Sequence, residues 1–313
     1  MESIVVTGAT SMLGTALIEA ALRDCGIRKI YAVVREDTQK ADRLPNDGRI
    51  ELVRCGIEDY QSLPDKIRSN ADVFYHFAWK LTGRLRSTDI HGQADNIGFA
   101  LDALSAARKL GCNKFIGAGS QAEYGGTVSA KMSPDTPANP TDAYGIAKFS
   151  AGRLAGLEAK RLGMDCFWVR VLSVYGEYDI PTTMVASTVA KIMRGESPEF
   201  TPAENIWDFL YSGDAGKAFY MIGKKSEGNK IYCLGSGEGR MLKEYIEAIG
   251  RIVNPDVKLR IGALPYQGGV GRNICADISE LVKDTGWEPE TAFEDGIRRV
   301  RDFLREKESI NIL

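Results

Sequence analysis

Short apolar runs alternate with longer, periodic stretches through the first 120 residues of this chain. The short runs have the length of buried strands, whereas the longer stretches repeat apolar residues every three to four positions, as one buried face of a helix requires. Five such alternations predict a parallel, doubly wound sheet with crossover helices, a fold of the α/β class. The predicted strands are 4–7, 29–34, 50–54, 71–78 and 114–118, and the predicted helices are 13–24, 59–67 and 95–110.

The alternation continues beyond residue 120 and breaks after Gly176. A helix over 143–162, strands over 165–172 and 230–234, and a helix over 184–193 are predicted from the same periodicities. We therefore predict about seven strands in one domain and a smaller C-terminal α+β lobe. The domain comprises 1–172 and 203–236, and the lobe comprises 173–202 and 237–313.

The turn after the first strand is built from small residues. Gly8 permits a tight turn, and Gly14 permits the following helix to approach the strand closely. The N–H groups and the dipole of the helix N-terminus then face the strand end, where they stabilise a pyrophosphate. A glycine turn alone is a weak signal, but the flanking strand and helix supply the context that a dinucleotide-binding motif requires. An ordinary turn of another α/β protein is the alternative.

Composition excludes several other classes of function. The 313 residues carry a formal net charge of −2 and contain no basic run, so we expect neither nucleic acid nor a membrane surface as a partner. No apolar run approaches membrane-spanning length, and we expect no signal peptide before the first strand. The six scattered cysteines form no Cys-x-x-Cys pair and there are only two histidines, so no metal site is expected. This pattern predicts a reduced, cytoplasmic protein.

Three polar residues are candidates for catalysis. Tyr144 and Lys148 are four positions apart on a predicted helix and therefore share one face, while Ser120 follows the strand 114–118 at its carboxyl end. A nearby cation lowers the high pKa of a phenol, and a serine hydroxyl can hydrogen-bond the reacting oxygen. Beside a nicotinamide, the three residues would form a hydride-transfer site in which tyrosine exchanges the hydroxyl proton. Without the glycine turn and Ser120, the Tyr-x-x-x-Lys spacing would be better explained as a chance occurrence on a helix.

These features resemble the extended short-chain dehydrogenase/reductases, and in particular the NAD(P)-dependent nucleotide-sugar epimerase/dehydratase family. The resemblance covers nearly the whole chain. It implies a Rossmann domain, a substrate lobe that binds a nucleotide sugar, and a homodimer formed through the helices near 95–110 and 143–162. It rests on Thr7-Gly8-x-x-Ser11-x-x-Gly14, His76-Phe77-Ala78, Asn96, Gly119-Ser120-x-x-x-Tyr124-Gly125, Tyr144-x-x-x-Lys148, Arg170, Tyr175-Gly176, Trp207-Asp208-Phe209-Leu210, Ala276-Asp277 and Gly286-Trp287-x-Pro289.

The resemblance also implies the cofactor contacts, with two departures from the family pattern. Ser11 replaces the middle glycine of the first turn, and its hydroxyl could bind a phosphate. Arg35 stands where an acidic residue binds the ribose of NAD, which favours NADP over NAD, although Glu36 and Asp37 follow directly. The expected cofactor contacts are Gly8, Thr10, Ser11, Met12, Leu13, Gly14, Arg35, Gly56, Ile57, Phe77, Ala78, Trp79, Asn96, Lys148 and Leu172.

The positions after Ser120 narrow the reaction. The 4,6-dehydratases of this family carry Asp-Glu there, whereas this chain has Gln121 and Ala122, so a 4-epimerase or 4-ketoreductase is favoured over a dehydratase. A non-catalytic NAD(P)-binding sensor or scaffold is the alternative. Trp207 occupies the place of a diphosphate-binding arginine and would either pack internally or stack on the substrate. The expected substrate contacts are Gln121, Glu123, Trp207, Gln267 and Arg272.

Overall fold

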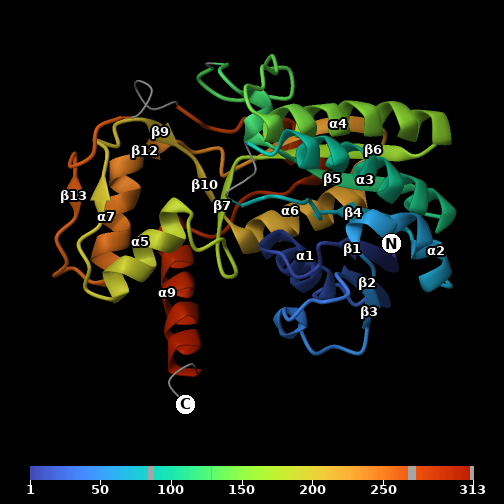
Figure 1. Cartoon of the computed structure of the whole chain (residues 1–313), viewed down its shortest axis with the longest axis horizontal. Coiled ribbons are helices and arrows are strands. Elements are labelled where there is room, and N and C mark those ends of the chain that lie inside the picture. Colours follow the sequence, from blue (N-terminus) through green and yellow to red (C-terminus); the bar gives the residue numbers. More distant parts are fainter. Residues whose placement is uncertain (84–87, 128, 267–272, 311–313) are drawn as a thin grey trace.

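A parallel sheet of seven strands forms the centre of the molecule, within the residues that the computed structural model describes, 1–83, 88–127, 129–266 and 273–310 (Figure 1). The strand order is β11-β6-β5-β4-β1-β2-β3, and every neighbouring pair is parallel. The prediction of a doubly wound sheet of about seven strands is confirmed. The strands are β1 (Ser3–Thr7), β2 (Lys29–Val34), β3 (Ile50–Arg54), β4 (Val73–His76), β5 (Lys114–Ser120), β6 (Asp165–Val171) and β11 (Asn229–Leu234).

Helices cover both faces of this sheet (Figure 1). Side chains of β1 alternate between the two faces, so Ile4 packs in one core with Leu17 and Phe219, while Val5 packs in the other with Leu104. The first core lies under α1 and α6, and the second under α3 and α4. These helices are α1 (Met12–Leu22), α2 (Leu63–Lys66), α3 (Ile90–Lys109), α4 (Ala143–Leu162) and α6 (Ser212–Lys225).

Most of the other elements form a smaller lobe with a core of its own (Figure 1). Val189, Ile249 and Ile297, one from each of three packed helices, are fully buried in it. The pairs β7–β10 and β9–β12 each join strands from opposite sides of the proposed domain division. The elements of the lobe are β7 (Ser173–Tyr175), α5 (Met184–Met193), β8 (Glu199–Phe200), β9 (Ile206–Trp207), β10 (Phe209–Tyr211), β12 (Arg240–Met241), α7 (Leu242–Val253), β13 (Arg260–Ile261) and α9 (Phe293–Ile310). The short helix α8 (Ser279–Thr285) packs instead against α6 and β11 of the sheet domain.

Some predicted boundaries need correction. The bounds of β2, β3, α4 and α5 are as predicted, but α3 begins at Ile90 instead of 95. Asp89 caps α3 by accepting a hydrogen bond from the Gly92 amide, so part of the expected loop is helical. Strand β5 continues to Ser120, and α1 ends before Gly26, at Leu22. The segment expected as one helix over 59–67 is a 3-10 helix, Ile57–Ser62, followed by α2.

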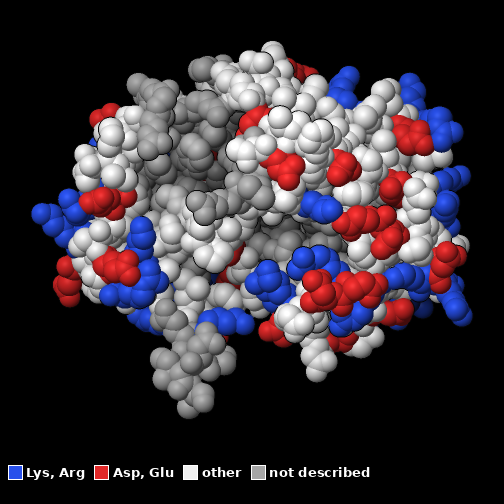
Figure 2. Space-filling view, in the orientation of Figure 1, with Lys and Arg blue, Asp and Glu red and all other residues white. Residues whose placement is uncertain are grey.

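The surface shows no dominant charge on the side seen in Figure 2. Lysine and arginine side chains are interspersed there with aspartate and glutamate. Of the helices in the described ranges, none has both the length and the apolar character needed to cross a bilayer.

Candidate active site

The turn between β1 and α1 lies where the strand order reverses, since β1 pairs with β2 on one side and with β4 on the other. Gly8 has a φ of +66°, and a Cβ on it would lie 2.8 Å from the Ala78 nitrogen. A Cβ on Gly14 would clash with the carbonyl oxygen of Gly8. Both positions therefore require glycine, and the N-terminus of α1 faces the crevice in which doubly wound sheets bind dinucleotides.

Ser11 and Thr10 shape the same turn. The Ser11 hydroxyl oxygen accepts a hydrogen bond of 3.1 Å from the Gly14 amide and caps α1, which leaves its hydrogen able to donate to a phosphate. The Thr10 carbonyl accepts a hydrogen bond of 3.2 Å from the Arg43 guanidinium. Arg35 follows β2, with a side chain that is 70% exposed and 3.8 Å from the Asp37 carboxylate. The exposed Arg35 is thus available to a ligand at the end of β2.

Several predicted cofactor residues serve in packing. Phe77 packs edge-to-face on Phe219, with ring centroids 4.8 Å apart, and Leu172 is buried in a small cluster with Tyr124 and Cys233. Leu13 and Ile57 pack, partly buried, against the two cores of the sheet. Their side chains therefore serve the hydrophobic cores around the turn. Of the others, Gly56 precedes the 3-10 helix Ile57–Ser62, and Met12 lines a cavity described below.

The segment that follows β4 is fixed to α3 by two buried amides. Asn96 accepts a hydrogen bond from the Lys80 amide at 2.8 Å and donates to the Lys80 carbonyl at 3.2 Å. Gln93 accepts from the Trp79 indole at 2.9 Å and donates to the Leu81 carbonyl at 3.0 Å. Asn96 thus contributes by holding the loop, and Gln93 is a residue that sequence reasoning missed. Its spacing of three from Asn96, on the same face of one helix, was the available signal.

Ser120, Tyr144 and Lys148 lie on adjoining elements. Ser120 ends β5, and its hydroxyl oxygen accepts a hydrogen bond of 3.1 Å from the Ala122 amide. Tyr144 lies in the first turn of α4, which packs closely enough that a Cβ on Gly145 would clash with the Ala122 carbonyl. The Lys148 amine donates a hydrogen bond of 2.6 Å to the carbonyl of Ala118 on β5. The three predicted catalytic residues therefore lie around the carboxyl end of β5, and we call this group the rim.

Lys148 is a buried cation with an unusual neighbour. Its side chain is only 4% exposed, and its amine lies 3.6 Å from the centroid of the Trp79 ring. Burial lowers the pKa of Lys148 to about 7, against the attraction of the Glu123 carboxylate. His76, which hydrogen-bonds Thr7 at 2.9 Å, is also buried, and burial with the Lys148 charge lowers its pKa to about 3. His76 is therefore neutral at physiological pH.

The structure corrects the prediction for Glu123. This residue is 1% exposed, and one oxygen accepts hydrogen bonds from the Ser120 amide at 2.8 Å and from the Trp168 indole at 2.9 Å. The other oxygen pairs with the Arg170 guanidinium at 2.9 Å, deep below the surface. Because both oxygens are engaged internally, Glu123 supports the end of β5 and is not placed to contact a substrate. Trp168 was not singled out from the sequence.

Trp207 and Gln121 meet at Ser173. The Trp207 indole donates a hydrogen bond of 2.7 Å to the Ser173 hydroxyl, which lies 3.4 Å from the Gln121 side-chain oxygen. Trp207 is part-buried and packs against Phe209, so the packing alternative accounts for part of its surface. Ser173 follows β6 at its carboxyl end, a position that could have marked it in the sequence. The predicted Gln267 and Arg272 lie outside the described residues.

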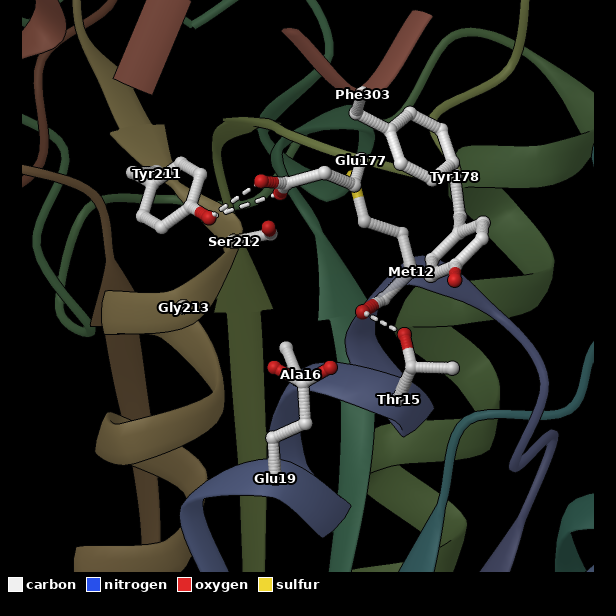
Figure 3. A pocket seen from close by; sticks show the side chains of 10 residues that line it. All are labelled: Met12, Thr15, Ala16, Glu19, Glu177, Tyr178, Tyr211, Ser212, Gly213 and Phe303. Carbon is white, nitrogen blue, oxygen red and sulfur yellow. Dashed lines mark hydrogen bonds between the residues drawn. The ribbon is translucent and has the colours of Figure 1, made fainter. Parts of the chain in front are cut away.

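A separate cavity of about 200 Å³ lies between α1, α6 and α9 (Figure 3). The Tyr211 hydroxyl donates to both Glu177 oxygens at 2.8 Å, and Glu19 faces the same space. Burial and the Glu177 charge raise the pKa of Glu19. None of the three catalytic candidates lines this cavity, so it lies apart from the rim that they form.

Known proteins share both the sequence pattern and the fold. The chain is 24% identical to a UDP-glucose 4-epimerase of Mycolicibacterium smegmatis, covering 96% of this chain and 98% of that protein. It is 23% identical to a dTDP-glucose 4,6-dehydratase of Streptomyces antibioticus, covering 97% and 92%. The UDP-glucose 4-epimerase of Thermotoga maritima, solved with UDP-glucose, matches with a TM-score of 0.86 at 22% identity, covering 98% and 99%. A UDP-glucuronic acid 4-epimerase of Bacillus cereus, solved with NAD, matches with a TM-score of 0.83 at 21% identity, covering 97% and 99%.

A family model matches far more than half of the sequence. It is described as the NAD dependent epimerase/dehydratase family, and it aligns with residues 4–235, from the first strand to the end of β11. The resemblance inferred from the motifs is thereby confirmed, and this chain belongs to the NAD-dependent epimerase/dehydratase family.

Proposed function

We propose that this protein is a nucleotide-sugar 4-epimerase that works with a bound nicotinamide dinucleotide. The observation that carries the proposal is the shared rim of Ser120, Tyr144 and Lys148, next to a glycine turn with the tight packing that a dinucleotide site requires. The residues of the turn fit the cofactor: the amides at the start of α1 would hold the pyrophosphate, and Lys148 would hold the nicotinamide ribose. When bound, the cofactor supplies reversible hydride transfer at a sugar carbon.

Each residue of the rim has a distinct role. Tyr144 exchanges the proton of the sugar hydroxyl, and the Lys148 cation lowers the cost of forming the phenolate. Ser120 donates its hydroxyl hydrogen toward the reacting oxygen, since the bond from the Ala122 amide uses a lone pair of the hydroxyl and leaves that hydrogen available. Inversion would require the bound cofactor to accept the hydride from one face of the sugar carbon and to return it to the other face.

The positions after Ser120 disfavour elimination of water. Neither Gln121 nor Ala122 can ionise, and the nearby Glu123 carboxylate is held by Ser120, Trp168 and Arg170. A dehydratase needs an acid and base free to face the substrate, so epimerisation or simple reduction is the chemistry that this rim supports. Reduction of a keto sugar would use the same three residues and would consume the reduced cofactor.

An assay of inverted product tests the proposal. Purified protein is incubated with a panel of UDP-sugars and dTDP-sugars, and inversion at C4 is followed by proton NMR without added cofactor. Tyr144→Phe should lower turnover by about 100-fold or more, because it removes the proton-exchanging group. Tyr178→Phe, in the separate cavity, is the matched control and should retain activity.

Other outcomes would decide between the alternatives. Net consumption of NADPH with keto sugars, and no inversion, would identify a ketoreductase. Dinucleotide binding with no turnover on the panel, unchanged in Tyr144→Phe, would favour a non-catalytic sensor or scaffold.

For the cofactor, we propose that NADP binds more tightly than NAD because Arg35 can pair with a 2′-phosphate. The exposed guanidinium at the end of β2, only loosely paired with Asp37, supports this assignment. Titration calorimetry on protein stripped of nucleotide should show weaker NADP binding in Arg35→Ala, with NAD affinity unchanged. Equal affinity for both cofactors in the native protein would contradict the proposal.

We also propose that the protein forms a homodimer through α3 and α4. Ile146, Leu154 and Leu157 lie along one side of α4 with 50%, 42% and 68% of their surface exposed, as a helix–helix interface would require. Leu157→Glu should convert the dimer to a monomer in sedimentation velocity, whereas Leu264→Glu, at an exposed leucine in the lobe, should not. A monomeric native protein would contradict the assignment.

A further inference from the structure

We propose that Trp79 is a positioning residue of the catalytic pair: its indole face holds the buried Lys148 amine in the charged form. The effect on catalysis rests on the proposed function, but the effect on Lys148 itself does not.

The contact between the two side chains is close and sheltered. The Lys148 amine lies 3.6 Å from the centroid of the Trp79 ring, whereas the rings of Tyr144 and Trp168 are each 5.9 Å away. A cation over the face of an indole is attracted by the ring quadrupole, and the attraction is largest where water is excluded. Lys148 is almost fully buried, so Trp79 replaces part of the solvation that the ammonium group has lost.

The indole is held in place at its edge. Its N–H donates to the Gln93 side chain, which is 1% exposed and also binds the Leu81 carbonyl. Leu81 has a φ of +60°, a left-handed conformation that is strained for a leucine. A Cβ on Gly92 would clash with the Leu81 side chain, so the absence of a side chain at Gly92 makes room for this turn. Strain of this kind persists only where neighbouring contacts enforce it, and it concentrates at functional sites.

Other charged groups around Lys148 do not replace the indole. Glu123 attracts the amine from the segment after β5, but its carboxylate is shared with Arg170 on β6. His76, on β4, is neutral, and the Ala118 carbonyl on β5 accepts one hydrogen bond. Tyr144, one turn earlier on α4, packs edge-to-face on Trp79, with centroids 6.2 Å apart and planes at 84°. Trp79 therefore contacts both members of the catalytic pair: its face meets the Lys148 amine, and it packs edge-to-face with the Tyr144 ring.

Direct titration of the lysine tests this inference. Protein labelled with ¹⁵N-lysine is titrated by NMR at the Nζ signal, and Lys148→Arg identifies the Lys148 signal. Trp79→Leu should lower the Lys148 midpoint by about one pH unit, the size expected for a desolvated cation–π contact. Trp79→Phe retains a weaker aromatic face and should give an intermediate midpoint. Trp207→Phe changes an indole that is hydrogen-bonded to Ser173 instead, and it should leave the midpoint unchanged.

The outcomes separate this inference from the proposed function. If the Lys148 midpoint is equal in the native protein, Trp79→Phe and Trp79→Leu, the role of Trp79 is overturned, whatever the activity. If Trp79→Leu does not fold, the midpoint of Trp79→Phe decides alone. In the active enzyme, the alkaline limb of the pH–rate profile should move to lower pH together with the NMR midpoint. A shifted midpoint in a protein that inverts no nucleotide sugar would support the Trp79–Lys148 contact and contradict the epimerase.

Discussion

Two buried charges lie within one wall of the cleft, and they are stabilised differently. Arg170 is paired with the Glu123 carboxylate at 2.9 Å, and that carboxylate also binds the Trp168 indole and the Ser120 amide. Lys148 is held instead by the Ala118 carbonyl and the face of Trp79. The first arrangement satisfies its charges within the protein, whereas the second leaves an ammonium group with donors to spare. The difference distinguishes a structural charge from one that can act on a ligand.

The largest expected effect is the loss of activity when the Lys148 charge is removed. Lys148→Met should lower turnover by about 100-fold or more, because Tyr144 loses the cation that favours its phenolate. The fold should persist, since methionine fills a similar buried volume without a charge. Turnover by NMR and thermal unfolding by circular dichroism would check both parts. A fully active Lys148→Met variant would place the chemistry elsewhere.

The second largest effect is expected on stability, when the buried Glu123–Arg170 ion pair is broken. Glu123→Gln leaves the Arg170 guanidinium buried without its counter-charge and should lower the free energy of unfolding by about 3–5 kcal/mol. Urea unfolding measures this loss. The double variant Glu123→Gln with Arg170→Met should recover part of it, because the unpaired charge is then absent. A loss below about 1 kcal/mol would mean that the pair resembles an exposed one.

The two charges should also differ in their dependence on pH. The pKa of Lys148 is lowered by burial to about 7, whereas that of an unfolded lysine is about 10.4. Between these values the unfolded chain binds more protons, so the contribution of Lys148 to stability becomes less unfavourable as the pH rises. Relative to Lys148→Met, the native protein should gain stability between pH 7 and 10 in urea unfolding. Parallel pH curves would show that Lys148 titrates normally.

The smallest effect is expected at an exposed pair. Lys80 and Glu58 lie 2.6 Å apart, but their side chains are 41% and 52% exposed. Glu58→Gln should therefore change the free energy of unfolding by less than about 1 kcal/mol, because water and salt screen the pair. The same urea measurement used for Glu123→Gln gives the comparison directly. If Glu58→Gln lowered the free energy of unfolding as much as Glu123→Gln, burial would not explain why the Glu123–Arg170 pair matters more.

Local sequence patterns predicted the sheet well and the site only in part. The bounds of β2, β3 and α4 follow from apolar runs and periodicity, which act within a few residues. Glu123 was placed among the substrate contacts because it closely follows Ser120, and its burial was missed because its partner Arg170 is 47 residues away in the sequence. Gln93 and Ser173 were missed although each carried a signal: Gln93 lies three residues from Asn96 on one helix face, and Ser173 follows β6 at its carboxyl end. The domain boundaries and the cytoplasmic location remain predictions.

The cap at the end of β5 has a consequence for the energetics of catalysis. The Glu123 carboxylate holds the Ser120 amide, and the Ala122 amide holds the Ser120 hydroxyl oxygen, so both ends of this serine are oriented within the protein itself. Such a group is preorganised: little binding energy is spent on ordering it, and its dipole does not have to reorient as charge develops on the substrate. Glu123, which faces no ligand, thereby keeps the reorganisation energy of the catalytic rim low.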